Sequence, residues 1–447
     1  MTRLNSIIIF LMLIWTGGCD SLPKSKAKQF KVNGLNVIIK ELPESDIVSA
    51  GFYLKGGVAY IPEEQAGIEQ LLLSVMPKGS EKYDKELLQG LTESIGTSIA
   101  GSGGRDYSTL TLQCLVDQFD QSWDIFQDVI LHPRLDSIEI ELERVNQLTN
   151  IRAESDNPDT YLQKLAREFY YQRHPYEQSP LGTEESISTL TRDDLLNYYK
   201  DNIKKSRALL VMVGGITKQD ILNIANDLAK ALPKGNSYKD RLPEHWSKNS
   251  AGMRVIKGDS DMPTNYLIGQ ANAPNKMSED YYPFLLASRK LGTRVFEEVR
   301  TKRNLSYAPA AGYSTGRSSY TYLYVTTTKP DTTIKVMYQE LDKLKETPLT
   351  EKEVKELRMM FLTRHYMSKE TVAAQRDVLA NYELTGPGYR YAEIFMKKVQ
   401  SVTAEDIQRV AKTYLTNYQF TYLGDPNAVN EDVFLSYSWP TNRWENK

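Results

Sequence analysis

Two stretches of this 447-residue chain recur at an almost constant distance, and this constrains the fold more than any other feature. Thr191–Leu195 is echoed by Thr403–Ile407, and each stretch is followed by a helical pattern and an apolar run. Leu135–Arg144 is echoed by Leu349–Arg358 at nearly the same offset. Each echo alone is a common helix pattern. The agreement of the two offsets predicts a duplicated domain of about 200 residues.

The composition limits the class of partner and the source of stability. Lys and Arg total 55 while Asp and Glu total 57, which gives a formal net charge of −2. Because nucleic-acid binding relies on an excess of basic groups, this balance argues against a nucleic-acid partner. Only two cysteines occur. Cys114 lies in an apolar run, so we expect a small buried side chain there rather than a disulfide.

The segment 1–19 has the pattern of an export signal. Arg3 supplies a positive start, Ile7–Trp15 is an uninterrupted apolar run, and a run of small residues ends in Cys19. This apolar run is too short for a stable membrane-spanning helix. The pattern resembles a bacterial lipoprotein signal, so we expect lipid attachment at Cys19. The alternative is an ordinary cleaved signal with an incidental cysteine.

Residues 67–80, with the sequence GIEQLLLSVMPKGS, predict an amphipathic helix. Their apolar side chains follow the i, i+3, i+4, i+7 spacing that places them on one helical face. These side chains are Ile68, Leu71, Leu72 and Val75. The Pro-Lys-Gly run at residues 77–79 then ends the helix. By periodicity alone this is a buried core helix.

The same stretch resembles the signature helix of the insulinase/pitrilysin family of zinc peptidases, in the branch that includes the mitochondrial processing peptidases. That family's pattern is roughly G-x-x-H-F-L-E-H-M-x-F-K-G-T. In it, two histidines one helical turn apart hold Zn²⁺, and the glutamate between them takes a proton from metal-bound water. At those three positions this chain has Gln70, Leu73 and Ser74.

The segment Ile138–Glu154 resembles the family's second ligand helix, E-R-x-x-x-x-x-E. Glu143 matches its first glutamate, but Asn150 occupies the position of its second glutamate, which is the family's third zinc ligand. Gln, Leu, Ser and Asn are poor zinc ligands or none, so we expect neither metal nor general base in this chain. The four histidines lack ligand spacing. They are His132, His174, His245 and His365.

The stretch TRVFEEVRTKRNLSYAPAAG, at residues 293–312, resembles the family's C-terminal signature S-R-L-F-x-x-L-R-x-x-x-x-L-x-Y. Arg300 and Tyr307 have the spacing of its Arg/Tyr pair. The resemblance implies that they bind the substrate backbone and support the oxyanion, since a guanidinium and a phenol O–H both donate hydrogen bonds. The alternative is an arginine at a helix end beside a tyrosine in a strand.

The resemblance covers about residues 30–425. It implies an α+β fold of two homologous domains, each an antiparallel-rich sheet with helices packed on one face. We predict an N-terminal peptidase-like domain with a degenerate zinc site over 28–235 and a C-terminal domain with the Arg/Tyr pair over 253–447. Residues 236–252 contain Gly, Pro, Asn and Ser without apolar periodicity, and we predict that they form the linker.

These features together favour a non-catalytic, peptide-binding subunit of a heterodimeric zinc metallopeptidase. The chain would need no cofactor of its own, because zinc would sit in a partner with an intact H-x-x-E-H motif. Its substrate would be a peptide or unfolded protein, and a lipid anchor would hold it at a bacterial envelope membrane, on the periplasmic side. The alternative is an inactive pseudo-peptidase that binds or scaffolds. A hydrolase using other residues lacks a recognisable Ser/His/Asp or Cys/His motif.

Overall fold

The computed structural model describes residues 26–243, 250–259 and 262–437. The signal predicted over 1–19, with Cys19, lies outside the described residues, as does the part of the linker at 244–249. Within the described ranges, no helix is both long enough and apolar enough to cross a membrane.

The first half of the chain builds a six-stranded sheet in the order β1-β2-β6-β3-β5-β4. All neighbouring strands are antiparallel except β2 and β6. The strands are β1 (Lys28–Val32), β2 (Leu35–Glu41), β3 (Ile47–Lys55), β4 (Ser98–Ser102), β5 (Tyr107–Leu115) and β6 (Ala208–Gly214). Three strands therefore occupy the region around Phe30–Ala50, where turn signals in the sequence predict two.

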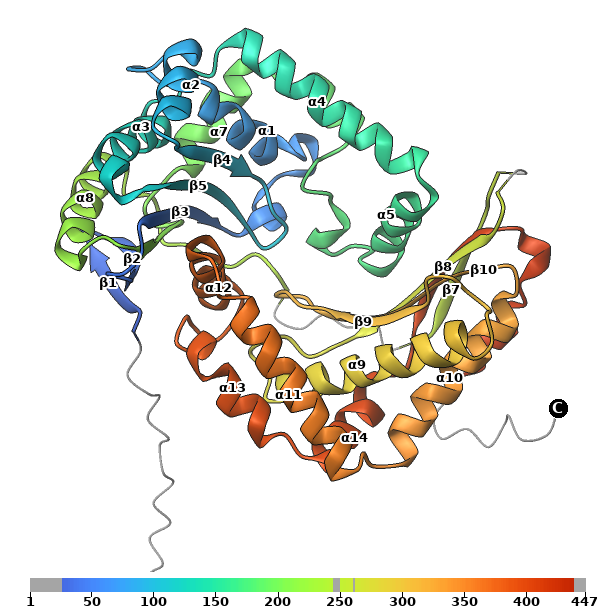
Figure 1. The fold of residues 1–447 in the computed structure, drawn as a ribbon. Coiled ribbons are helices and arrows are strands. Elements are labelled where there is room, and N and C mark those ends of the chain that lie inside the picture. The colour runs from blue at the N-terminus through green and yellow to red at the C-terminus, as the bar shows by residue number, and fades with distance from the viewer. Residues whose placement is uncertain (1–25, 244–249, 260–261, 438–447) are drawn as a thin grey trace, which may run out of the picture.

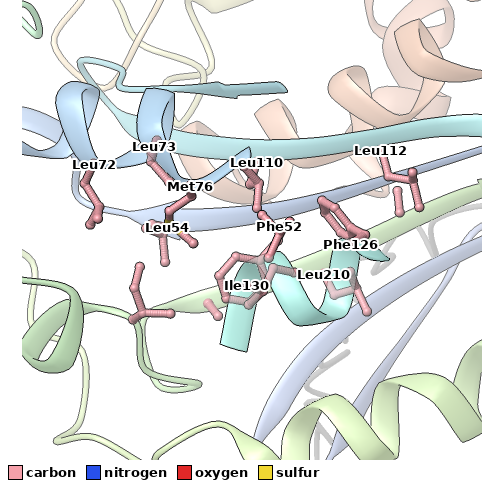
Figure 2. Close-up of a cluster of buried hydrophobic side chains, with 14 of the residues drawn as sticks. Phe52, Leu54, Leu72, Leu73, Met76, Leu110, Leu112, Phe126, Ile130 and Leu210 are labelled. Atoms are coloured by element: carbon pink, nitrogen blue, oxygen red, sulfur yellow. The ribbon is translucent and has the colours of Figure 1, made fainter. Parts of the chain in front are cut away.

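Helices cover one face of this sheet and enclose the first core (Figure 1). Side chains of β3 at every second position enter that core, as the two-residue period of a strand requires. Figure 2 shows part of this core, including Phe52, Leu110 and Phe126. Cys114 is 3% exposed within it. The helices of this half are α1 (Ile68–Val75), α2 (Lys85–Ser94), α3 (Phe119–Leu131), α4 (Ser137–Asp156), α5 (Pro158–Tyr170), α6 (Glu184–Thr189), α7 (Arg192–Asn202) and α8 (Lys218–Ala231).

The second half repeats this topology. Its five-stranded sheet has the order β7-β11-β8-β10-β9, which matches β2-β6-β3-β5-β4 strand for strand. The strands are β7 (Gly252–Lys257), β8 (Asn265–Asn272), β9 (Ala310–Ser314), β10 (Tyr320–Thr327) and β11 (Gln419–Gly424). The helices are α9 (Tyr281–Val295), α10 (Pro330–Glu346), α11 (Glu351–Met367), α12 (Val372–Thr385), α13 (Tyr391–Ser401), α14 (Ala404–Tyr414) and α15 (Glu431–Leu435). The predicted α+β fold of two homologous units is confirmed.

The two halves exchange one helix each, which sequence reasoning does not predict. Helix α5 of the first half packs on the open face of the second sheet, and α12 of the second half packs on the open face of the first sheet (Figure 1). The contacts of α5 join Leu162 and Ala166 to Ile268 and Leu423. Those of α12 join Leu379 and Ala380 to Ile38, Leu209 and Val211. The offset between the two helices equals that between Leu135 and Leu349, so they are equivalent elements of the duplicated fold.

A buried arginine fixes α12 to the first sheet. Arg376 is 6% exposed, and its guanidinium donates from Nη1 to the Ser49 hydroxyl at 2.8 Å and to the Ala50 carbonyl at 3.3 Å. Its Nε donates to the Tyr53 hydroxyl at 3.1 Å, and that hydroxyl donates to Asp377 at 2.7 Å. Because Asp377 also pairs with the guanidinium at 2.8 Å, the charge is compensated within the interface.

We expect Arg376→Ala to lower the free energy of unfolding by about 2–6 kcal/mol, because it leaves the Ser49 hydroxyl and the Ala50 carbonyl buried without their donor, at about 1–3 kcal/mol each. Arg152→Ala is the matched control. Arg152 pairs with Glu184 where both side chains are more than half exposed, and such pairs contribute about 0–1 kcal/mol. Urea denaturation measures both variants. Equal effects would contradict the anchoring role of Arg376.

Candidate functional site

Helix α1 is held by its apolar face and by a buried ion pair. Gly67 precedes it with φ +86°, and a Cβ at this position would collide with the Leu181 carbonyl, so only glycine fits. Glu69 is fully buried and pairs with Arg207 at 2.7 Å, while the Tyr198 hydroxyl donates to the same carboxylate at 2.6 Å. Burial raises the pKa of Tyr198 well above its usual value, so this phenol stays a donor.

The positions of the two family histidines form a hydrogen-bonded clasp. The Gln70 amide donates to the Ser74 hydroxyl at 2.8 Å, one helical turn away. The Gln70 carbonyl oxygen accepts from the backbone N–H of Gly103 at 2.7 Å, just beyond the end of edge strand β4. Gly101 lies so close to the Leu73 carbonyl that a Cβ would collide with it. The glycine-rich segment after β4 is therefore tied to α1 by side-chain bonds.

The other two family positions do not complete a polar centre. Leu73 is 1% exposed and lies in the first core beside Met76, as Figure 2 shows. Asn150 is exposed on α4, one helical turn beyond Gln147, whose amide donates to the Gly67 carbonyl at 3.2 Å. The four positions that the resemblance assigns to the family site thus lie on α1 and α4, with an apolar side chain at the position assigned to the base.

The donor set at this site does not fit zinc. An amide, a hydroxyl already bonded to that amide and an exposed amide lack the thiolate, imidazole or carboxylate ligands that zinc prefers. Glu143 is ion-paired with Lys78 at 3.0 Å. In the part of the chain that the structure describes, no group of three or more His, Cys, Asp or Glu side chains could hold a metal ion.

Arg300 and Tyr307, predicted from the second signature, lie against each other. The Arg300 guanidinium carbon lies 4.2 Å from the centroid of the Tyr307 ring and 5.1 Å from that of Phe296. Tyr307 is 78% exposed and Phe296 is 43% exposed. Two aromatic rings therefore orient the guanidinium at the surface. Phe296 occupies the phenylalanine position of the matched signature, but it was not predicted to belong to the site.

A change in helix type positions this arginine. The sequence predicts one continuous helix over Asp280–Arg300, but α9 ends at Val295 and the segment Phe296–Thr301 is π-helical. The Lys302 N–H donates to the Glu297 carbonyl at 2.9 Å, the i to i+5 step of a π-helix. Such segments are rare and are frequent at functional sites, because the extra residue re-aims the side chains that follow.

The two candidate centres belong to opposite halves of the molecule. The clasp lies on α1 in the upper half of Figure 1, and the Arg/Tyr pair follows α9 in the lower half. In chain order, α1 lies between β3 and β4, and α9 lies between β8 and β9. Because β3 matches β8 and β4 matches β9, α1 and α9 are equivalent elements of the duplicated fold. The clasp lies within α1 itself, whereas Arg300 and Tyr307 follow α9, in the segment where the first half has α2.

We expect Gln70→Ala to accelerate hydrogen exchange at the Gly103 amide, because that N–H loses its side-chain acceptor. Loss of one such bond corresponds to about 0.5–1.5 kcal/mol, or up to about tenfold in exchange rate. Gln70→Glu retains an acceptor and is the matched control. NMR-detected exchange measures both variants, with amides of the central strand β3 as internal reference. An unchanged Gly103 rate would contradict the clasp.

His174 gives a pH-dependent prediction. It is 3% exposed and its Nδ1 accepts from the Tyr176 N–H at 3.0 Å. Burial and the nearby Arg105 lower its pKa from 6.5 to about 4. The unfolded chain therefore binds this proton first, and stability falls as the pH drops from about 6.5 towards 4. His365 makes a similar contribution, because burial and the positive charge of Lys369 lower its pKa from 6.5 to about 4.

We accordingly expect His174→Asn, which keeps an acceptor for Tyr176, to lose less stability than the wild type between pH 7.5 and pH 4.5. His365 contributes to the slope that remains, as do carboxyl groups such as Glu298, whose pKa is lowered to about 2 by hydrogen bonds from Lys302 and Arg303. Urea midpoints at the two pH values give the comparison. An identical loss in variant and wild type would show that His174 does not titrate in this way.

Comparison with known proteins is consistent with this geometry. A family model described as "Insulinase (Peptidase family M16)" matches residues 36–184, and one described as "Peptidase M16 inactive domain" matches residues 189–361. The chain is 24% identical over 404 residues to an uncharacterized zinc protease of Rickettsia felis, covering 88% of this chain and 96% of the relative.

Two further relatives differ in their described activity. A mitochondrial-processing peptidase subunit beta of Lentinula edodes is 23% identical over 411 residues, 87% of either chain. The non-peptidase homolog YmxG of Helicobacter pylori is 21% identical over 438 residues, 92% of this chain and 97% of the relative. A crystal structure of a peptidase M16 inactive domain from Pseudomonas fluorescens has the same fold, with a TM-score of 0.81 and 19% identity over 89% of this chain and 98% of that chain.

Proposed function

Because the chain belongs to the insulinase family of peptidases (peptidase family M16) as an inactive homologue, we propose that it is the non-catalytic, peptide-binding subunit of a heterodimeric zinc metallopeptidase. One observation carries the proposal. The Gln70 position is closed by its bonds to Ser74 and Gly103, whereas Arg300 is stacked on Tyr307, whose ring is 78% exposed. The chain presents donors for a substrate at one site and has no catalytic groups at the other.

The stacked pair suits a peptide backbone. Stacking occupies the faces of a guanidinium, while its five N–H donors point outward in the plane of the group. The edge of Arg300 can therefore donate to carbonyl oxygens of an extended peptide, and the Tyr307 hydroxyl adds a further donor. Where negative charge develops on such a carbonyl, preorganised donors of this kind stabilise it.

The remaining parts of the enzyme would come from a second chain. A partner with an intact H-x-x-E-H motif would carry the zinc and the general base. The relative named as a subunit of a processing peptidase supports an arrangement in pairs. The substrate would be a peptide or unfolded protein. A lipid on Cys19 would anchor the complex at the periplasmic side of a bacterial envelope membrane.

We expect Arg300→Ala to lower kcat of the purified complex by about 10²–10³, the usual effect of removing one preorganised donor. Assembly should be unchanged, because the substitution removes one partly exposed side chain and no contact in the core of the subunit. Arg303→Ala is the matched control, since Arg303 is an exposed arginine in the same turn whose side chain bonds to Glu298. Turnover of a fluorogenic peptide provides the measurement. Unchanged turnover in the Arg300 variant would remove the role assigned to it.

A binding or scaffolding pseudo-peptidase is the second candidate, and the similarity to a relative named as a non-peptidase homolog favours it. A pull-down of the tagged chain from its own membranes, with mass spectrometry, separates the two. A stoichiometric partner with H-x-x-E-H is the result expected for the split enzyme. Recovery of the chain alone, or with unrelated envelope proteins, would favour the scaffold.

A further inference from the structure

The second sheet carries a row of tyrosines on the face opposite its core. In β10, Leu323 and Val325 are fully buried in the second core. The alternate residues Tyr320, Tyr322 and Tyr324 face the other way, as the two-residue period of a strand requires. They remain partly exposed and line an open pocket of about 480 Å³. This volume falls within the range of about 300–1,000 Å³ that ligand pockets occupy.

The neighbouring edge strand leaves the pocket open. Strand β9 pairs with β10 on one side only and ends the sheet. Gly312 stands opposite Tyr322, and a Cβ on Gly312 would collide with the Tyr322 ring. The ring therefore lies directly over the backbone of β9. The other lining residues of β9 that face this side are small, namely Ala310 and Ser314.

The floor and the far wall of the pocket come from different halves of the chain. Ile268 of β8 contributes an apolar floor, and Gln163 of the exchanged helix α5 contributes the wall. The hydroxyl of Tyr324 donates to Asp159 at the start of the same helix. Every residue that lines the pocket is uncharged. A charged guest would therefore lose its hydration without gaining an ion partner.

The segment that carries Tyr307 lies at the Tyr324 end of the pocket. Ala310, which lines it, stands opposite Tyr324 and closely follows Tyr307 in the chain. The chain before β9 runs along the same end of β10, because the Thr327 hydroxyl donates to the Leu305 carbonyl at 2.8 Å. A peptide bound by Arg300 and Tyr307 can thus extend a side chain into the tyrosine row.

We propose that this pocket is a specificity subsite that takes one aromatic or large aliphatic side chain of the peptide held by Arg300 and Tyr307. Aromatic rings offer such a guest a large apolar area and favourable edge-to-face packing. The inference rests on the proposed peptide-binding function and adds to it a substrate class: extended peptides with a bulky apolar residue near the bound backbone.

The test uses the full-length chain in lipid nanodiscs and a labelled host peptide of Gly, Ser and Thr with one central guest. The guests are Phe, Leu, Ser and Glu, and fluorescence anisotropy gives the affinity. We expect Phe and Leu to bind about tenfold or more tightly than Ser and Glu, as burial of a large apolar side chain requires. Equal affinities for Phe and Ser would overturn the proposal.

Two variants assign the preference to this pocket. Ala310→Phe fills it from β9, and Tyr322→Ser removes the central ring, so each should reduce the Phe-over-Ser ratio to about one. Tyr366→Ala removes a tyrosine that is 68% exposed on α11 and should leave the ratio unchanged. Thermal unfolding monitors the fold of all three. A preference that survives both pocket variants would overturn the assignment.

The experiments distinguish failure of the subsite proposal from failure of the proposed function as a peptide-binding subunit. If Arg300→Ala abolishes turnover of the complex while all guests bind equally, the subunit role stands and the subsite is wrong. If the guests differ and the pocket variants remove the difference while Arg300→Ala leaves turnover intact, the pocket binds apolar side chains and the role of Arg300 is wrong.

Discussion

The exchange of α5 and α12 is the interaction on which the rest of this structure depends. Every residue of β6 is buried, so the first sheet needs apolar cover on both of its faces. The helices of the first half cover one face, and α12 of the second half covers the other. Burial of apolar surface stabilises by about 25 cal/mol per Å². Neither half encloses its own sheet without the other. Each half is thereby fixed to the other through a helix, α5 on the second sheet and α12 on the first. The exchange therefore also fixes the position of the Arg/Tyr pair in the second half relative to α1 in the first.

Helix α1 shows why a metal-site framework can persist without its ligands. Its position depends on the buried pair Glu69–Arg207 and on apolar residues in the first core, contacts that a zinc ion at the family positions would not supply. Removal of one partner from a buried ion pair typically costs about 3–5 kcal/mol. A single clasp bond such as that from Gly103 to Gln70 contributes about 0.5–1.5 kcal/mol. The helix is thus held mainly by an ion pair and apolar contacts, neither of which requires a bound metal.

The sequence predicts the features that depend on short-range patterns. The duplication, the extent of α1 and the juxtaposition of Arg300 with Tyr307 follow from offsets, periodicity and a matched signature, and the structure places the last two side chains in contact. The exchanged helices could not be predicted, because an amphipathic helix does not specify which sheet it covers. The π-helical turn, in which Val299 is buried, has no signature in the helical periodicity of the sequence. The alternation of Tyr320, Tyr322 and Tyr324 is visible in the sequence. The pocket beside them is not, because it depends on Gly312 in the neighbouring strand and on where α5 crosses the sheet.

The duplication supplies two copies of an edge strand beside a helix, β4 beside α1 and β9 beside α9. Both are closely packed, because a Cβ on Gly101 would collide with the Leu73 carbonyl and one on Gly292 with the Ala311 carbonyl. In the first half, β4 lies against α1, and the glycines at 101 and 103 permit a contact so close that α1 and the strand end share hydrogen bonds. In the second half, β9 has small residues on its open face, and the π-helical turn after α9 places the partly exposed Arg300 against two exposed aromatic rings. Exposed aromatic rings and unpaired edges carry a risk of aggregation that a protein accepts where something binds. The two halves differ in the segment between the helix and the edge strand, where the first half has α2 and the second half has the π-helical turn with Arg300 and Tyr307. This exposed aromatic surface supports the proposal that the second half binds a ligand.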